Sequence, residues 1–332
     1  MDYARDGVLL HFFNDEAIVR SLIRAGHTEA DARNYAPVGC LEPNAQGKTF
    51  GSTFAVQFNS IKCLELALSN GIDNIFGQEN GIRSGDPAAF ASFEDVWNAY
   101  DAQFTHFIGQ MVKGMACLDQ AIAERVPFPF ASAMIEGPLE KGCDLTAGGA
   151  VYNSTGVELM GFSNIADSLY AVNKVVFEEG RYDIKDLVQW LSEDWMDHEE
   201  EQQYLRNHVA KYGNDIDAVD GMAARVMNHF CDRLAVHKNF RGGSFWPGVF
   251  SVGFHISMGA FTGATPDGRA AGETLGNGVT PSNGRATTGP TAVMNSVAKL
   301  PLTRISNGMN LNMRLPGKRI AAKSTMNLIQ GY

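Results

Sequence analysis

Cys40 and Glu42 stand two residues apart in a short segment that is bounded by Pro37 and Pro43. Proline donates no backbone hydrogen bond and disfavours helix in the residue before it, so this segment is predicted to be extended or looped. In an extended backbone, residues i and i+2 project from the same side. One small substrate could therefore touch both the thiol and the carboxylate. The alternative for an isolated Cys-x-Glu is a buried structural cysteine beside a solvated glutamate.

The composition narrows the class of protein. The chain has 332 residues, is 45% hydrophobic and carries a formal net charge of −10, which argues against nucleic acid or an anionic membrane as the main partner. Five scattered cysteines form no CxxC pair, so neither a disulfide framework nor a metal site is indicated. The first residues lack the apolar core of a signal peptide, and no apolar run is long enough to span a bilayer. We expect a cytoplasmic protein.

Helical patterns alternate with short apolar runs, which predicts the α/β class. Asn14 and Asp183 are expected to cap helices, and a long helix is expected to run from Ser92 to Arg125. Another helix is predicted beyond Gly51-Ser52-Thr53. Its apolar face would comprise Phe58, Ile61, Leu64 and Leu68.

Four blocks of sequence together resemble one family. They are Gly39-Cys40-Leu41-Glu42-Pro43, the glycine-rich segment 142–153, the segment 262–281 containing Pro266-Asp267-Gly268-Arg269, and the segment 295–300. In this order they resemble the glycyl radical enzymes of the pyruvate formate-lyase-like superfamily. The resemblance implies a ten-stranded α/β barrel, built from two antiparallel five-stranded half-barrels, surrounded by helices and with a central cysteine finger loop. It divides this chain into a finger loop at about 36–54 and a C-terminal half-barrel with helices at about 55–332.

The resemblance also implies a mechanism. A glycyl radical, installed by a separate radical-SAM activating enzyme, would take the hydrogen atom of Cys40. The thiyl radical on Cys40 would then abstract hydrogen from a small substrate, and Glu42 would act as acid and base in eliminating water or another leaving group. A homodimer is implied for the full-length protein.

This loop carries one cysteine, Cys40, whereas the loop of pyruvate formate-lyase itself carries two adjacent cysteines. The form Gly-Cys-x-Glu-Pro is similar to the diol dehydratase, choline lyase and isethionate lyase branch. A formate acetyltransferase-like or decarboxylating C–C lyase of the same superfamily is the alternative. Glycerol-type dehydratases carry an aspartate where this chain has Phe54, which counts against a polyol substrate. Thr53 and Gln57 are the polar candidates for lining the substrate pocket.

Two parts of the family pattern are not found. About forty residues precede Cys40, and no Arg-Val-x-Gly-Tyr-like motif precedes Tyr332, so Gly331 has no matching context. We therefore expect an internal fragment that lacks the N-terminal half-barrel and the glycyl radical domain, and that is inactive alone. Two other function classes stay open: a non-catalytic remnant, and a hydrolase that uses Cys40 as nucleophile with a distant histidine.

Overall fold

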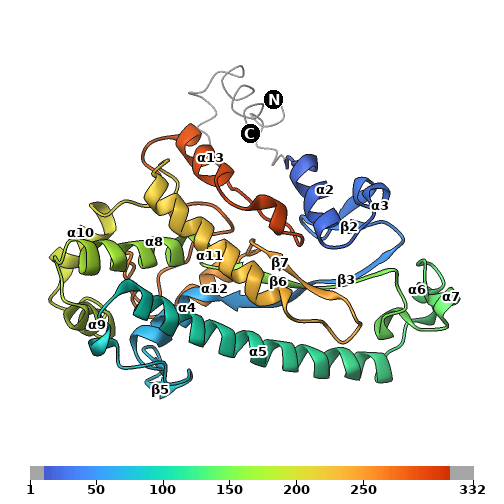
Figure 1. Cartoon of the computed structure of the whole chain (residues 1–332), viewed down its shortest axis with the longest axis horizontal. Helices are drawn as coiled ribbons and strands as arrows, with labels where there is room; N and C mark the ends of the chain where they lie inside the picture. Colours follow the sequence, from blue (N-terminus) through green and yellow to red (C-terminus); the bar gives the residue numbers. More distant parts are fainter. Residues whose placement is uncertain (1–10, 315–332) are drawn as a thin grey trace.

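A parallel sheet of three strands forms the centre of the protein. The computed structural model describes residues 11–314, and in this part strands β3 (Thr49–Asn59), β6 (Tyr152–Met160) and β7 (Ser244–Gly248) lie in the order β3-β6-β7 (Figure 1). Gln57 pairs with Glu158 on β6, which pairs with Gly248 on β7. The mixture of helices and parallel strands confirms the predicted α/β class. The complete barrel stays a prediction.

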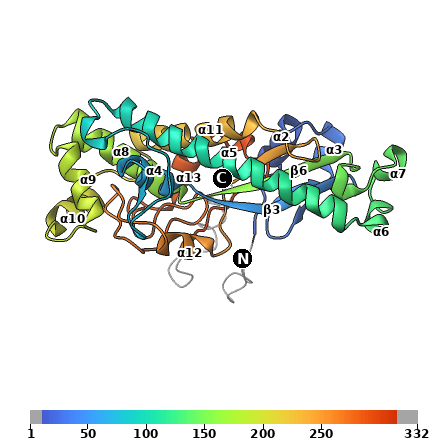
Figure 2. The same cartoon turned by 90° about the horizontal axis from the view of Figure 1, so that it is seen from below.

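One face of the sheet is covered by four helices: α4 (Ser60–Leu68), α5 (Phe93–Arg125), α8 (Phe162–Val172) and α11 (Asp217–Ala235). Figure 2 shows α5 and α11 on one side of the sheet and α12 on the other. Val157 and Leu159 of β6 belong to the buried core, together with Phe104 of α5 and Phe230 of α11. Since side chains alternate along a strand, Glu158 between them faces away from these helices.

The remaining elements surround this core. In chain order they are α2 (Asp15–Arg24), α3 (Glu29–Arg33), β1 (Tyr35–Val38), β2 (Glu42–Ala45), β4 (Ile72–Asp73), β5 (Gln78–Glu79), η1 (Pro87–Ala89), α6 (Pro129–Ser132), α7 (Pro138–Lys141), η2 (Leu145–Ala147), the π-helical turn η3 (Asn173–Glu178), α9 (Ile184–Ser192), α10 (Glu199–Asn207), α12 (Phe254–Ala260), α13 (Pro290–Ala298) and η4 (Leu302–Arg304).

Local signals placed most helix starts correctly. Asn14 accepts a hydrogen bond from the backbone of Ala17, and Asp183 accepts one from that of Lys185. The long helix α5 begins after Ser92 and ends at Arg125, as expected. The helix predicted beyond Thr53 begins later than expected, because Phe58, which was assigned to its apolar face, lies in a strand.

Strand β3 occupies residues 49–59, and helix α4 begins only at Ser60. Phe58 and Gln57 are therefore strand residues, and residues 49–54, which were expected to belong to the finger loop, lie in β3. The aromatic and β-branched residues of this segment favour a strand beside β6, whereas the helical spacing of Phe58 and Ile61 arises where strand passes into helix.

A buried ion pair fastens α5 to the sheet. Arg241, just before β7, donates from Nη1 to Asp119 Oδ1 at 2.7 Å, and both side chains are at most 3% exposed. Its Nη2 atom donates to the carbonyl of Ser154 at 2.5 Å and to the hydroxyl of Thr155 at 3.1 Å. Removing one partner of such a pair leaves an uncompensated buried charge.

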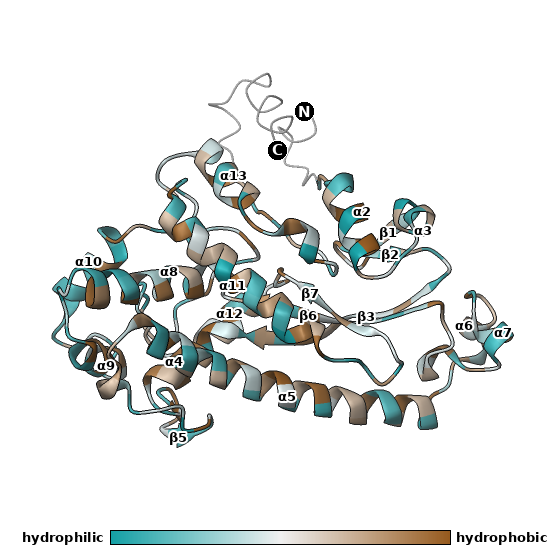
Figure 3. Ribbon diagram, in the orientation of Figure 1, coloured by the Kyte–Doolittle hydropathy of each residue, from teal (hydrophilic) through white to brown (hydrophobic). Residues whose placement is uncertain are grey.

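Large apolar side chains are exposed near α6 and α7. Phe130 is 82% exposed, Leu139 is 71% and Met134 is 70%. Figure 3 places hydrophobic residues among hydrophilic ones over this end of the molecule and along α5. No helix in residues 11–314 is both long and apolar enough to cross a membrane.

Candidate active site

Cys40 lies in the turn of a β-hairpin. Strands β1 and β2 pair antiparallel, with Pro37 opposite Pro43 and Val38 opposite Glu42. Since neither proline has an N–H group, this pair fits a position in the ladder where facing residues exchange no backbone hydrogen bonds. The two prolines thus allow a hairpin whose turn is the segment Gly39-Cys40-Leu41.

The carboxylate of Glu42 is folded back over this turn. Its Oε2 atom accepts hydrogen bonds from the backbone N–H of Cys40 at 3.0 Å and of Leu41 at 2.8 Å, and the residue is 4% exposed. Gly39 has φ +63°, and a Cβ there would lie 3.0 Å from Glu42 Oε1. Cys40 itself is exposed. The structure is thus the reverse of a buried cysteine beside a solvated glutamate: the thiol is accessible and the carboxylate is buried.

The hairpin lies against the sheet face that the four helices leave uncovered. A Cβ on Gly51 of β3 would lie 2.7 Å from Asn44 Oδ1 of β2 and 3.0 Å from Ser154 Oγ of β6. On another side of the turn, Gly308 has φ +90°, and a Cβ there would lie 2.6 Å from the carbonyl oxygen of Leu41. The close approach of the hairpin to these two glycines therefore fixes its position against the sheet, and a larger residue at either glycine would displace it.

Asn307, the residue before this glycine, connects the turn region to the sheet. Its Nδ2 atom donates to the carbonyl of Thr53 at 2.6 Å and to Glu158 Oε1 at 2.7 Å. Its backbone N–H donates to the carbonyl of Pro247 on β7 at 2.9 Å. One asparagine therefore bonds to all three strands of the sheet.

Glu158 is a residue of this site that the sequence analysis missed. Its side chain is fully buried, and burial raises its pKa to about 9, with the nearby charge of Glu42 as the next cause. The hydrogen bond from Asn307 lowers the pKa but does not offset these effects. A signal was present, because a glutamate between Val157 and Leu159 interrupts an apolar strand.

The structure places Thr53 and Gln57 on β3 beside this region. The carbonyl of Thr53 bonds to Asn307, and Gln57 Nε2 donates to the carbonyl of Phe54 at 3.3 Å. A register shift between Ser52 and Val56 disturbs the pairing of β3 with β6 here. Phe54 lies among aromatic rings, 5.8 Å from Phe250 and 5.7 Å from Phe254 between centroids.

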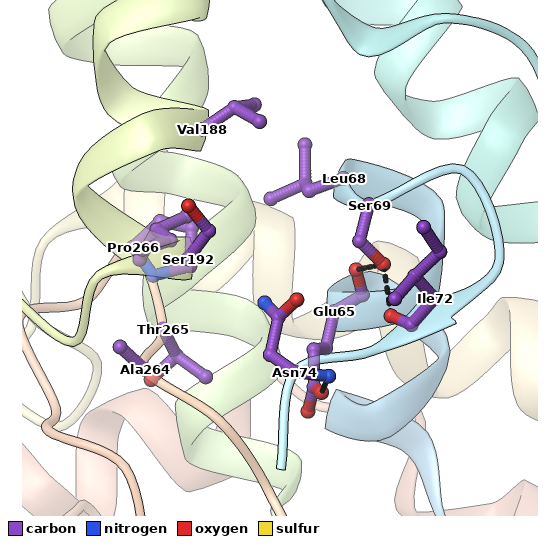
Figure 4. Close-up of a pocket in the computed structure, with 11 residues that line it drawn as sticks. Glu65, Leu68, Ser69, Ile72, Asn74, Val188, Ser192, Ala264, Thr265 and Pro266 are labelled. Carbon is purple, nitrogen blue, oxygen red and sulfur yellow. Dashed lines mark hydrogen bonds between the residues drawn. The ribbon is translucent and has the colours of Figure 1, made fainter. Parts of the chain in front are cut away.

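A separate cavity of about 290 Å³ lies between the end of α4, helix α9 and the segment 264–266 (Figure 4). Its buried acid, Glu65, already bonds to Lys62 and to the backbone N–H groups of Asn74 and Gly263. No residue of the β1–β2 hairpin lines it. It does not contribute to the Cys40 site.

Three aspartates near the start of α11, Asp215, Asp217 and Asp220, have ligand atoms close enough together for a metal ion. The ammonium group of Lys299 bonds to all three at 2.7 to 2.9 Å. A lysine thus supplies the positive charge, and the cluster is an ion-pair network between α11 and the end of α13.

Comparison with known proteins identifies the family. The Pyruvate formate lyase-like family model matches residues 1–259, and the Glycine radical family model matches residues 275–330. The chain therefore belongs to the pyruvate formate lyase-like family. The second match disagrees with the expectation that no glycyl radical domain is present, because residues 275–330 were expected to belong to the half-barrel region. It does not include Gly331.

The chain is 33% identical over 314 residues to (2S)-3-sulfopropanediol dehydratase of Klebsiella oxytoca, covering 93% of this chain and 38% of the relative. It is 32% identical to trans-4-hydroxy-L-proline dehydratase of Clostridioides difficile, and the match covers 97% of this chain and 41% of the relative. The glycerol-bound B12-independent glycerol dehydratase from Clostridium butyricum superposes with a TM-score of 0.94 at 38% identity, covering 98% and 42%. The chain thus spans about two fifths of the length of these proteins.

Proposed function

We propose that this chain is the part of a glycyl radical lyase that carries the thiyl cysteine, Cys40, and the acid/base, Glu42. The observation that carries the proposal is the hairpin turn, where an exposed thiol stands beside a buried carboxylate that is bonded to the backbone of the same turn. The similarity to dehydratases supports it.

Cys40 has the properties that hydrogen-atom transfer requires. An S–H bond is weak enough for reversible exchange with carbon, so neither a thiolate nor a metal is needed at the sulfur. A glycyl radical would supply the step that removes the thiol hydrogen atom. A nucleophilic cysteine would instead need a base within hydrogen-bond reach. In the part of the chain that the structure describes, no histidine bonds to the Cys40 thiol.

Glu42 would carry the proton chemistry. When Cys40 sulfur takes a hydrogen atom from a substrate carbon that bears a hydroxyl, the S–H bond forms and the C–H bond breaks. Glu42 removes the hydroxyl proton, and the resulting ketyl radical expels the group on the adjacent carbon with its bonding electrons. Protonated Glu42 gives its proton to the leaving group, and the carbon radical regains hydrogen from Cys40.

The substrate pocket would include Thr53 and Gln57, with Phe54 among the aromatic rings described above. Phe54 offers no hydrogen-bond acceptor where a polyol-specific site would place an aspartate, so we propose a substrate other than glycerol. Installation of the radical by a radical-SAM activating enzyme and assembly as a homodimer are part of the proposal. The cytoplasmic location stays a prediction.

The test uses the protein expressed from its natural locus and activated anaerobically by its activating enzyme. The substrates are those of its relatives: (2S)-3-sulfopropanediol, trans-4-hydroxy-L-proline, isethionate and glycerol. We expect Cys40→Ser and Glu42→Gln to reduce turnover by at least about 10³-fold while the glycyl radical signal in electron paramagnetic resonance persists. Cys117→Ser, at another exposed cysteine, is the control and should keep full activity. Turnover by Cys40→Ser would disprove the assigned role.

A further inference from the structure

Two buried glutamates share the space between the hairpin and the sheet. Glu42 is 4% exposed and Glu158 is 0% exposed. In the described part of the chain, neither forms an ion pair with lysine, arginine or histidine, whereas the buried Glu65 is paired with Lys62. Two carboxylates that are close together, buried and without a cation cannot both be ionised at low energetic cost.

The hydrogen bonds distinguish the two carboxyl groups. Glu42 Oε2 accepts two backbone N–H bonds from the turn, an arrangement that favours a negative charge. Glu158 Oε1 accepts a hydrogen bond from Asn307, and its Oε2 atom is buried without a partner among the described residues. An ionised carboxylate accepts on both oxygens, while a protonated one carries a hydrogen on the second. The charge therefore belongs on Glu42 and the proton on Glu158.

The sheet is built to hold Asn307 against Glu158. Gly156 lies two residues before Glu158 on the same face of β6, and a Cβ there would lie 2.3 Å from Asn307 Nδ2. A Cβ on Gly248 of β7 would lie 3.3 Å from the Asn307 side chain. Glycines in two adjacent strands thus leave the room that the asparagine occupies.

We propose that Glu158 is a positioning residue for Glu42: as a buried neutral acid beneath the hairpin, it leaves Glu42 as the ionised member of the pair. This inference rests on the proposed role of Glu42 and makes that residue a base at the start of the catalytic cycle. Burial and the charge of Glu42 both raise the pKa of Glu158, in agreement with the assignment from the contacts. When Glu42 takes the substrate proton, both members of the pair are neutral, and Glu42 can then act as the acid.

The first test is infrared difference spectroscopy of the 332-residue chain at neutral pH, which needs neither radical nor turnover. We expect Glu158→Gln to remove a C=O stretching band of a protonated carboxyl group, whereas Glu42→Gln removes carboxylate bands. Glu65→Gln is the matched control at a buried, ion-paired glutamate and should remove carboxylate bands only. Loss of carboxylate bands in Glu158→Gln would overturn the proposal.

A second measurement uses the unaltered chain and so does not depend on whether a variant folds. With ¹³C-labelled glutamate, one side-chain carboxyl resonance should keep the chemical shift of a protonated carboxyl group at neutral pH. Neutral pH is far above the ordinary glutamate pKa of about 4.3, so all other glutamate side chains should show the shift of an ionised carboxylate. If every glutamate carboxyl group is ionised at neutral pH, the proposal is wrong.

Alkylation of Cys40 by iodoacetamide, followed by mass spectrometry, reports which glutamate is charged. Removing a negative charge near the thiol should speed alkylation, so Glu42→Gln should raise the rate by roughly fivefold at contact distance in water. Glu158→Gln should leave it unchanged, with Cys117 as an internal reference for reagent and pH. An equal acceleration in both variants would contradict a neutral Glu158.

Discussion

Replacing Glu158 with glutamine should make the stability of the folded chain less dependent on pH. The pKa of Glu158 rises from 4.5 in a solvated chain to about 9 in the folded protein. Between these values the unfolded chain is ionised at this residue, while the folded chain keeps the proton. The folded state therefore binds one more proton, and its stability falls as pH rises.

The magnitude follows from the linkage relation. Each pH unit in this window costs about 1.36 kcal/mol of the free energy of unfolding, or roughly 4 kcal/mol between pH 5 and pH 8. Glutamine ionises in neither state, so the variant does not lose this stability as the pH rises. Its free energy of unfolding, measured relative to that of the unaltered chain, should therefore increase by the same amount between about pH 5 and pH 8. Other titrating groups are common to both proteins and cancel in the difference.

The assay is urea denaturation of both proteins at about pH 5, 6.5 and 8, with the difference in unfolding free energy plotted against pH. Glu16→Gln, at an exposed residue of α2, is the control and should give a nearly flat difference. A flat line for Glu158→Gln as well would mean that Glu158 is ionised in the folded protein. The reasoning from its burial and from the neighbouring charge of Glu42 would then be refuted.

Three further substitutions test the packing around the site by chemical denaturation. Arg241→Met should cost about 3–5 kcal/mol of unfolding free energy, because it leaves the buried carboxylate of Asp119 without its cation. Arg20→Met, at an exposed ion pair of α2, is the control and should cost less than about 1 kcal/mol. Equal costs would contradict the burial argument. Gly156→Ala should cost about 1–3 kcal/mol of unfolding free energy, because its Cβ would lie 2.3 Å from the carbonyl oxygen of Thr53 on β3. Unchanged stability would show that the two strands can separate there. Gly39→Ala should cost about 1 kcal/mol of unfolding free energy, because the φ of this residue is +63°. It should also change the alkylation rate of the Cys40 thiol. If the turn tolerates alanine, the stability and the alkylation rate will both stay unchanged.

Local sequence signals predicted the elements that depend on local contacts. Asn14, Ser92 and Asp183 precede helices in the structure as they do in the sequence, since a capping side chain bonds within its own first turn. The segment 49–59 was assigned partly to loop and helix, because its strand character depends on β6, about a hundred residues away. Arg269, in the block 262–281, likewise acts locally, because its guanidinium group bonds to carbonyls of its own loop, including those of Thr262 and Gly263.

The sequence by itself determined that a thiol and a carboxylate lie in one short segment, because two prolines and a glycine control the backbone between Pro37 and Pro43. It also carried the family resemblance that the comparisons confirmed. Only the tertiary structure decided that Cys40 is exposed and Glu42 is buried, since burial depends on the sheet beneath the hairpin. It alone brought in Glu158 and Asn307, which lie more than a hundred residues from the turn, because a buried glutamate acquires its protonation state from the charges and donors that folding places around it.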